Sequence, residues 1–290
     1  MEFTKQFLRA KNPCANGFRW FVRHIEDGVG YQHALDTLVQ AGRVEDALWL
    51  LRQFGPTNTV LSVDSLEAQD LVFAGTVLVR SVIDVEGVLH AGRSIQAGGG
   101  IRCGGALAAG EDIRAGAHIR SQGAVHCGGD LRAGWGVEAQ DAVTCGGELR
   151  AAWDVVCQGA LRVGAGASVG QDLLVQGPID CGKSLRVGGH LNGADSLRAA
   201  QGIVVGGAIT GVTHVEAGWG IKAGESIEAH GAIKAGESLS AGDAIRAGEG
   251  YGIFAGLSVQ EDAWDTSAQV WARDLPAGLR SGVWMGACAV

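Results

Sequence analysis

The chain has 290 residues, of which 48 are glycine and only 4 are proline, while 47% of all residues are apolar. Average glycine usage is about 7%, and this excess comes without the proline of collagen or the low hydrophobicity of disordered chains. It is typical of tight turns repeated many times. The formal net charge of −8 argues against a nucleic-acid-binding surface, although it suits a basic protein partner.

The N-terminus, the apolar stretches and the cysteines indicate the cellular compartment of the protein. The N-terminus has no apolar segment of the kind a signal peptide needs, and no stretch approaches 18 uncharged apolar residues. Seven cysteines are an odd number, and at least five occupy predicted core positions. We therefore expect a protein of the reducing cytoplasm, with no disulfides, no ordinary secretion signal and no membrane span.

Residues 1–56 carry helical spacing in four stretches separated by Gly and Asn, namely residues 3–10, 17–24, 32–40 and 44–54. The Gly55-Pro56 pair ends the last of these helices. We expect an α-helical N-terminal cap over residues 1–56 that closes the first coil of the region that follows.

A six-residue repeat fills the middle of the chain. From Leu71 to Leu257 every sixth residue is Leu, Ile or Val, except Ala167 and Tyr251, and no insertion interrupts the count. A small residue usually follows two positions later, and then a glycine. Positions i and i+2 face the same side of a strand, whereas a helix would need a period of 3.6. Each hexapeptide is therefore predicted to form a very short strand and a corner.

A longer period gives the shape of each coil. Aligning residues 121–138 with residues 139–156 places Trp135 over Trp153. Eighteen residues are three hexapeptides, which predicts a mainly β fold, a triangular β-helix (β-solenoid) over residues 57–260. About ten coils at ~4.8 Å would give a rod roughly 50 Å long. Left-handed acyltransferase-type and right-handed bactofilin-type helices both have triangular coils; the i, i+2 pattern is closer to the second, but the sequence does not fix the hand.

Residues 261–290 abandon the hexad and form a predicted C-terminal cap, with Trp264, Trp271, Trp284 and a final strand over residues 281–285. A β-helix exposes unpaired strand edges at both ends, and natural solenoids cap them to avoid end-to-end growth. We expect both ends to be closed and the protein to be a monomer on its own.

The core cysteines resemble metal ligands at first sight. Cys127, Cys145 and Cys181 are expected on one side of the triangle, and Cys103 and Cys157 on another. They have no C-x-x-C motif and no ligand-spaced histidines, and a thiol in place of Ala or Val behaves as a small hydrophobe. We expect core filling, with no metal and no cofactor.

A row of cations follows one outward face in the 18-residue register: Arg114, Arg132, Arg150, Arg186 and Lys222. Acidic residues two positions before the first three (Asp112, Asp130 and Glu148) should point the same way and neutralise them, at about 0–1 kcal/mol per exposed pair. Arg186 and Lys222 lack this compensation, so we regard both as candidate partner-binding residues.

Three tryptophans give the best local indication of a contact surface. Trp135 and Trp153 occupy the fifth position of their hexads, at a corner that points away from the core, and Trp219 has the same position on another corner. Simple stacking along the corner is the competing interpretation. Because Trp is enriched at interface hot spots, all three are candidate partner-binding residues.

Catalytic groups are not evident. None of the eight histidines pairs with a Ser or Cys nucleophile in a recognisable arrangement, and the Gly-rich corners lack the Lys-Ser/Thr ending of a phosphate loop. Hexapeptide acyltransferases usually build their site with a loop extruded from the coils, and the unbroken register leaves no such loop. We expect no catalytic residues and no enzymatic activity.

Several distinctive segments are spread over nearly the whole chain. They are CANGFRWF (14–21), GRVEDALWLL (42–51), the Ile-x-Ala-Gly repeats, GYGIFAGL (250–257) and LRSGVW (279–284). Together they resemble a largely uncharacterised family of bacterial β-solenoid proteins with a helical N-terminal cap. Some members of that family resemble immunity proteins paired with secreted antibacterial toxins. The resemblance implies no catalytic residues.

The leading hypothesis is a cytoplasmic immunity protein that binds and neutralises a cognate toxin domain through a solenoid face. A negative net charge would favour capture of a basic toxin such as a nuclease. No nucleic-acid or membrane partner is expected. The alternative is a structural scaffold that polymerises as bactofilins do, and closed ends would argue against it. The sequence leaves open the chemistry of the toxin and which of the three faces is used.

Overall fold

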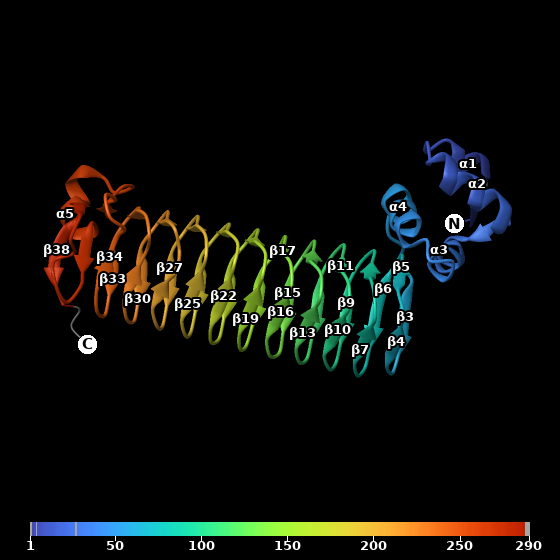
Figure 1. Ribbon diagram of the computed structural model, residues 1–290, viewed down its shortest axis with the longest axis horizontal. Helices are drawn as coiled ribbons and strands as arrows, with labels where there is room; N and C mark the ends of the chain where they lie inside the picture. The colour runs from blue at the N-terminus through green and yellow to red at the C-terminus, as the bar shows by residue number, and fades with distance from the viewer. Residues whose placement is uncertain (1, 4, 27, 288–290) are drawn as a thin grey trace.

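The computed structural model describes residues 2–3, 5–26 and 28–287, and its central feature is a three-sided parallel β-solenoid (Figure 1). Three sheets of 11, 12 and 13 strands run along the rod, and each strand except those at the sheet ends pairs with strands of the coils before and after it. In the regular part the register is 18 residues, so that Ile101 lies between Ile83 and Ile119. The predicted triangular β-helix is confirmed.

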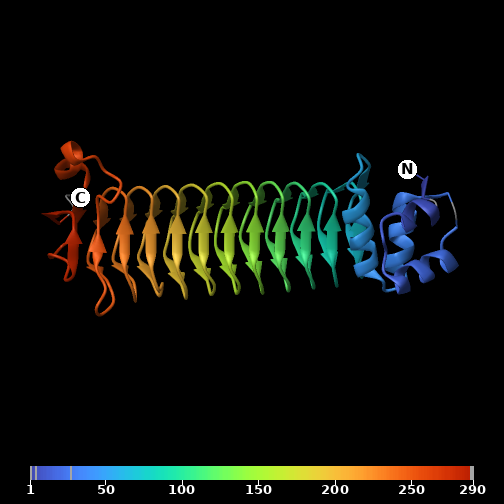
Figure 2. The same cartoon turned by 90° about the horizontal axis from the view of Figure 1, so that it is seen from above.

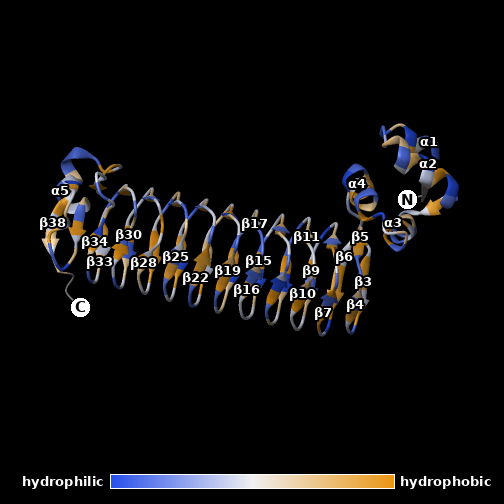
Figure 3. Ribbon diagram, in the orientation of Figure 1, coloured by the Kyte–Doolittle hydropathy of each residue, from blue (hydrophilic) through white to orange (hydrophobic). Residues whose placement is uncertain are grey.

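The hexad sets the strand positions. Strand β7 begins at Ile83, and each later strand begins six residues further on, as far as β33 at Leu239. These strands cover three residues, except β28 (Ile209–Thr210) and β31 (Ile227–Glu228). The first and third residues of each strand point into the core and the middle one points outward. Hydrophobic and hydrophilic segments therefore alternate along the coils (Figure 3).

The rod is longer than the predicted ten coils, because further strands precede and follow the regular hexads. The sheet that carries the candidate site has 13 strands, which at ~4.8 Å between neighbours corresponds to roughly 60 Å. The coils stack in a straight row (Figure 2). Besides the regular strands of the previous paragraph, this 13-stranded sheet contains β3 (Val60–Val63), β6 (Thr76–Val79), β36 (Gln269–Trp271) and β38 (Val283–Gly286).

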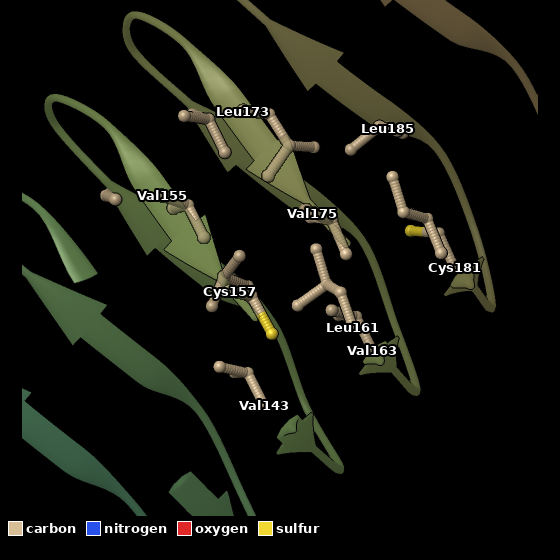
Figure 4. Close-up of a cluster of buried hydrophobic side chains, with 14 of the residues drawn as sticks. Val143, Val155, Cys157, Leu161, Val163, Leu173, Val175, Cys181 and Leu185 are labelled. Atoms are coloured by element: carbon tan, nitrogen blue, oxygen red, sulfur yellow. The ribbon is translucent and has the colours of Figure 1, made fainter. Parts of the chain in front are cut away.

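The core cysteines fill space as predicted, and their thiols also donate hydrogen bonds. Figure 4 shows Cys157 and Cys181 among Val and Leu side chains inside the tube. Cys157 Sγ lies 3.2 Å from the carbonyl oxygen of Asp141, one coil earlier, and Cys127 Sγ lies 3.0 Å from that of Glu111. Burial raises the pKa of the Cys157 thiol. Cys288 lies outside the described residues.

Among the described residues, the helices before the solenoid lie close to the predicted stretches: α1 (Lys5–Arg9), α2 (Ala15–His24), α3 (Tyr31–Gln40) and α4 (Val44–Phe54). The first is shorter than predicted because the chain before it forms β1 (Glu2–Phe3), which pairs with β2 (Val29–Gly30). The buried faces of the helices form a small core of their own, separate from the tube.

The helices meet the solenoid at β5 (Leu71–Phe73), the first strand of the 12-stranded sheet. The outward side chain of Val72 is fully buried in the helical core. Gln32 of α3 donates to the Val72 carbonyl oxygen at 3.0 Å and accepts from the Ala74 amide at 2.8 Å. In contrast, Leu61 of β3 and Leu66 of β4 (Leu66–Ala68) point into the tube but stay partly exposed. The helices therefore cover the first strand of the 12-stranded sheet, whereas the first strands of the other two sheets stay partly open.

The register does not run unbroken to Leu257, and this prediction was wrong. Strand β35 (Ile253–Phe254) pairs with β32 (Ile233–Ala235) so that Ile253 lies beside Ile233, at a spacing of 20 residues. Tyr251 and Leu257, which the period assigned to the core, are 51% and 54% exposed. A turn at Gly250, with φ of +79°, accommodates the two extra residues that follow β34 (Ile245–Arg246).

The last part of the chain also differs from its prediction. The single strand expected over residues 281–285 is two strands, β37 (Leu279–Ser281) in the 12-stranded sheet and β38 in the 13-stranded sheet. Gly282 separates them with φ of +116°, a backbone conformation that favours glycine. A short helical segment, η1 (Glu261–Ala263) and α5 (Trp264–Ser267), lies before them. The predicted cap extends to residue 290, and its last three residues lie outside the described part.

Candidate functional site

The predicted cation row lies on the outward face of the 13-stranded sheet. Arg114 pairs in register with Arg132, and Arg132 with Arg150. Arg186 and Lys222 continue the same row on β24 (Leu185–Val187) and β30 (Ile221–Ala223). The 18-residue spacing thus placed all five cations correctly on one face.

The first half of this row is neutralised by ion pairs. Asp112, Asp130 and Glu148 lie 2.7, 2.7 and 2.5 Å from the arginine two residues further on. Each aspartate also accepts a hydrogen bond from a backbone amide of the next coil. Asp112 Oδ1 accepts from the Asp130 amide at 2.8 Å, and Asp130 Oδ1 accepts from the Glu148 amide at 2.9 Å. That amide, and then Arg132, hold the pKa of Asp130 below its usual value. The predicted acidic ladder is therefore also part of the backbone hydrogen bonding.

Compensation ends in the second half of the row. The acidic positions are replaced there by uncharged residues: Gly166, Ser184, Gly202 and Gly220. Among the residues that the structure describes, Arg186 and Lys222 take part in no ion pair. Val204, between them in the row, is exposed. This half of the face is therefore cationic and partly apolar.

The other two faces carry acidic residues beside their cations. On the 12-stranded sheet, for example, Asp180 and Glu216 alternate in register with Arg162, Arg198 and Lys234. Arg102 lies 2.9 Å from Asp84 on the 11-stranded sheet, and Arg246 lies 2.5 Å from Glu228 further along it. On the 12-stranded sheet, the distance between Arg198 and Glu216 is 3.2 Å. The second half of the 13-stranded face thus differs from its neighbours in charge.

A shallow hollow of about 230 Å³ opens on this face. It lies over β21 (Ala167–Val169), where the row has a serine, Ser168, in place of an arginine. Arg150 and Arg186 line it from the two neighbouring strands, and Lys183 and Gln201 line it from an adjoining corner. This hollow was not predicted from the sequence; its signal there is the pair of small residues at Ala167 and Ser168.

Trp135 and Trp153 stack on the corner between the 13-stranded and 11-stranded sheets. Their ring centroids are 5.5 Å apart with planes inclined by 10°, and each side chain is 46% exposed. His118, from the coil before, meets Trp135 edge-on at 5.0 Å, while its Nδ1 accepts from the Gly136 amide at 3.2 Å. The stacked pair therefore packs against His118 of the preceding coil, while nearly half of each tryptophan remains exposed to solvent. His118 was missed because neither its spacing nor its type marks it.

Trp219 is half exposed, but it lies away from the stacked pair. It occupies the corner between β29 (Val215–Ala217) of the 12-stranded sheet and β30 of the 13-stranded sheet. This is the opposite edge of the same face, nearly four coils from Trp153, or ~18 Å along the rod. The face therefore holds all five predicted residues on its surface or edges, and it brings only Trp135 and Trp153 into contact.

The described residues contain no group of three His, Cys, Asp or Glu side chains arranged to hold a metal ion. None of the described helices is long and apolar enough to cross a membrane.

Comparison with known proteins concerns the helical region. Residues 1–54 match the family model described as the YdhT N-terminal domain. The match ends where α4 ends, before the first strand of the solenoid. A search of curated proteins found no match to this chain, and a search of solved structures found none.

Proposed function

We propose that this protein binds another protein through the outward face of its 13-stranded sheet, and that it is an immunity protein that neutralises a bacterial toxin. The observation that carries the proposal is the stacked, half-exposed pair of Trp135 and Trp153. It lies at the edge of a face on which two further cations, Arg186 and Lys222, form no ion pair among the described residues. Exposed Trp and Arg side chains are enriched at interface hot spots.

The scaffold favours binding by a preformed surface. Backbone hydrogen bonds join every coil to its neighbours, for example from the Trp153 amide to the Trp135 carbonyl oxygen at 3.1 Å. A surface fixed in this way loses little conformational entropy when a partner binds. A flat side of a long rod suits the covering of a toxin's active surface, and this role needs no chemistry from the rod itself.

Charge contributes to the proposal at two levels. The net charge of −8 would accelerate encounter with a basic toxin domain, while the cationic half of the binding face would orient the two proteins. The buried, unpaired thiols suit the reducing cytoplasm in which we propose that the toxin is met.

The direct test is rescue of growth. A toxin domain encoded beside this protein would be expressed in a bacterial host with either the wild-type chain or a Trp135→Ala/Trp153→Ala double variant. We expect wild-type protein to restore growth and the double variant to fail, because removal of two hot-spot side chains costs about 2 kcal/mol or more of binding free energy.

Tyr251→Ala is the matched control. Tyr251 is also a half-exposed aromatic residue packed edge-on against a histidine, His214, at 5.4 Å, but it lies near the C-terminal end. It should rescue like the wild type. Equal rescue by the double variant, at equal protein levels, would exclude the tryptophan corner as the contact surface.

One observation favours the second candidate function, an end-to-end scaffold of the bactofilin type. Leu61 and Leu66 point into the tube from the first strands of two sheets and remain partly exposed, as an uncapped end would require. Light scattering across a hundredfold range of concentration separates the two. A constant mass of one chain supports the immunity function, and growing rods support the scaffold.

A further inference from the structure

The cation row contains one gap with an unusual composition. Three adjacent strands place Arg150, Ser168 and Arg186 side by side in register. With strands ~4.8 Å apart, the two arginine Cα atoms are ~9.6 Å from each other, separated by a side chain of only two heavy atoms. Gly166 lines the same hollow and adds no side chain. The gap is therefore open enough for a small group to reach both guanidinium groups.

Donors dominate the lining of the hollow. Arg150, Lys183 and Arg186 supply cations, and Glu148 is the single carboxylate, already 2.5 Å from Arg150. Two positive charges are therefore uncompensated here, in a chain whose net charge is −8. Such a site selects an anionic group by charge.

The uncharged side chains add to this preference. Ser184 Oγ donates to Gln201 Oε1 at 3.2 Å, an orientation that leaves the Gln201 amide nitrogen as a donor. The Ser168 hydroxyl is exposed at the floor of the gap and is able to donate as well. The planar guanidinium group of Arg186 matches the two oxygens of a carboxylate.

We propose that the hollow over Ser168 binds the carboxylate of an Asp or Glu side chain presented by the partner protein. This inference rests on the proposed function and names the chemistry of its contact. Strand β18 (Leu149–Ala151) carries Arg150 and leads directly into the corner that holds Trp153. A partner segment that packs an apolar side chain on the stacked tryptophans would therefore bring a neighbouring acidic side chain over the hollow.

The open form of the hollow distinguishes a delivered side chain from a free anion. Exposed ion pairs contribute only about 0–1 kcal/mol, so a free anion such as phosphate would remain hydrated and bind weakly. A carboxylate held at a protein interface is shielded from water, and its charge-assisted hydrogen bonds are then stronger. Recognition by this site should therefore depend on the apolar contact next to it.

The test uses the full-length chain and does not need the toxin. Backbone amide NMR signals of Ser168, Lys183 and Gln201 would be followed during titration with a hexapeptide of alternating glutamate and leucine. A glutamine–leucine hexapeptide is the neutral control, and inorganic phosphate is the free-anion probe. We expect saturable shifts with the acidic peptide, at least tenfold weaker binding of phosphate, and no shifts with the neutral peptide.

Variants assign the shifts to the hollow. Arg186→Gln should weaken binding of the acidic peptide about fivefold to tenfold. Arg246→Gln is the matched control, because Arg246 is an exposed arginine on another sheet that is already paired with Glu228; it should bind as the wild type does. Both side chains are exposed, so the remaining NMR spectrum will verify the fold.

Three results would overturn the proposal: absence of shifts with the acidic peptide, equal affinity for phosphate and peptide, or undiminished binding by the Arg186→Gln variant. The outcome is separable from that of the growth assay. Peptide binding with no rescue by wild-type protein would retain the carboxylate site and remove the immunity function. Rescue without peptide binding would retain the immunity function and remove the carboxylate site.

Discussion

At the scale of single residues, corner glycines set how closely the coils stack. A Cβ atom built on Gly104 would lie 2.0 Å from the carbonyl oxygen of Glu86 in the coil before, which is far inside contact distance. The backbone of Gly104 is not in the left-handed region, unlike that of Gly250. These glycines are therefore needed for close approach between coils, whereas from the sequence we expected them to supply backbone freedom at the corners.

Substitution Gly104→Ala should consequently destabilise the protein by about 2–3 kcal/mol, because either the methyl group or the coil has to move. Gly202→Ala is the matched control. Its nearest neighbour, the carbonyl oxygen of Gly220, would be 3.4 Å from the new Cβ, so its effect should be close to zero or slightly stabilising. Thermal unfolding followed by circular dichroism measures both. Equal melting temperatures for the two variants would contradict the stacking explanation.

The candidate site shows what single residues could reveal in advance. Trp135 and Trp153 recur at 18 residues, so the repeat alone placed one over the other on a corner, and the structure shows that their rings stack. His118 and Gln201 join the site through side-chain orientations between coils, and no repeat specifies those. The hollow depends on the absence of an arginine at Ser168, which is noticed only when the row is known to be a continuous surface.

At the scale of elements, Gln32 acts as a substitute for a preceding strand. Its amide group donates to Val72 and accepts from Ala74, which are the backbone groups that an additional coil would use. An unpaired strand edge is a site for unwanted association, and one side chain from α3 blocks it at β5. The helical region is thereby joined to the solenoid by hydrogen bonds as well as by apolar packing.

Gln32→Ala should therefore weaken the junction by about 1–3 kcal/mol, since two partly buried backbone groups lose their partner. Hydrogen exchange of the Ala74 amide should accelerate by one to two orders of magnitude. Gln40→Ala, at the exposed end of the same helix, is the control and should leave Ala74 exchange unchanged. If Ala74 exchanges at the same rate in both variants, Gln32 does not cap the edge.

Strand positions could be predicted from the sequence wherever the six-residue repeat alone determines them. A six-residue period fixes strand positions from β7 to β33, because each strand makes the same contacts with its neighbours. Beyond β34 the six-residue period continues in the sequence as far as Leu257. In the structure the chain turns at Gly250, and the strand register shifts by two residues. Aliphatic spacing alone does not report such a shift, because Leu257 fits the pattern while lying outside the core, and the one exception before it, Tyr251, resembles the earlier exception Ala167, which is in the core.

At the scale of the whole molecule, the repeat makes three long surfaces and the charges make them unequal. On two faces acidic residues lie beside the cations on neighbouring strands, in ion pairs such as Arg102 with Asp84 and Arg198 with Glu216, or in register, as Asp180 does beside Arg162. On the third face, compensation stops after Glu148 while the cations continue to Lys222. This asymmetry is what a binding surface on an otherwise regular rod would require.

The proposed contact on this face is tested most directly by hydroxyl-radical footprinting of the protein alone and in complex with a toxin domain that it neutralises in the growth assay. Oxidation of Trp135 and Trp153, read by mass spectrometry, should fall at least threefold in the complex, with a smaller decrease at Trp219 and no change at Tyr251. A stable complex in which Trp135 and Trp153 are oxidised as fast as in the free protein would show that the partner binds elsewhere.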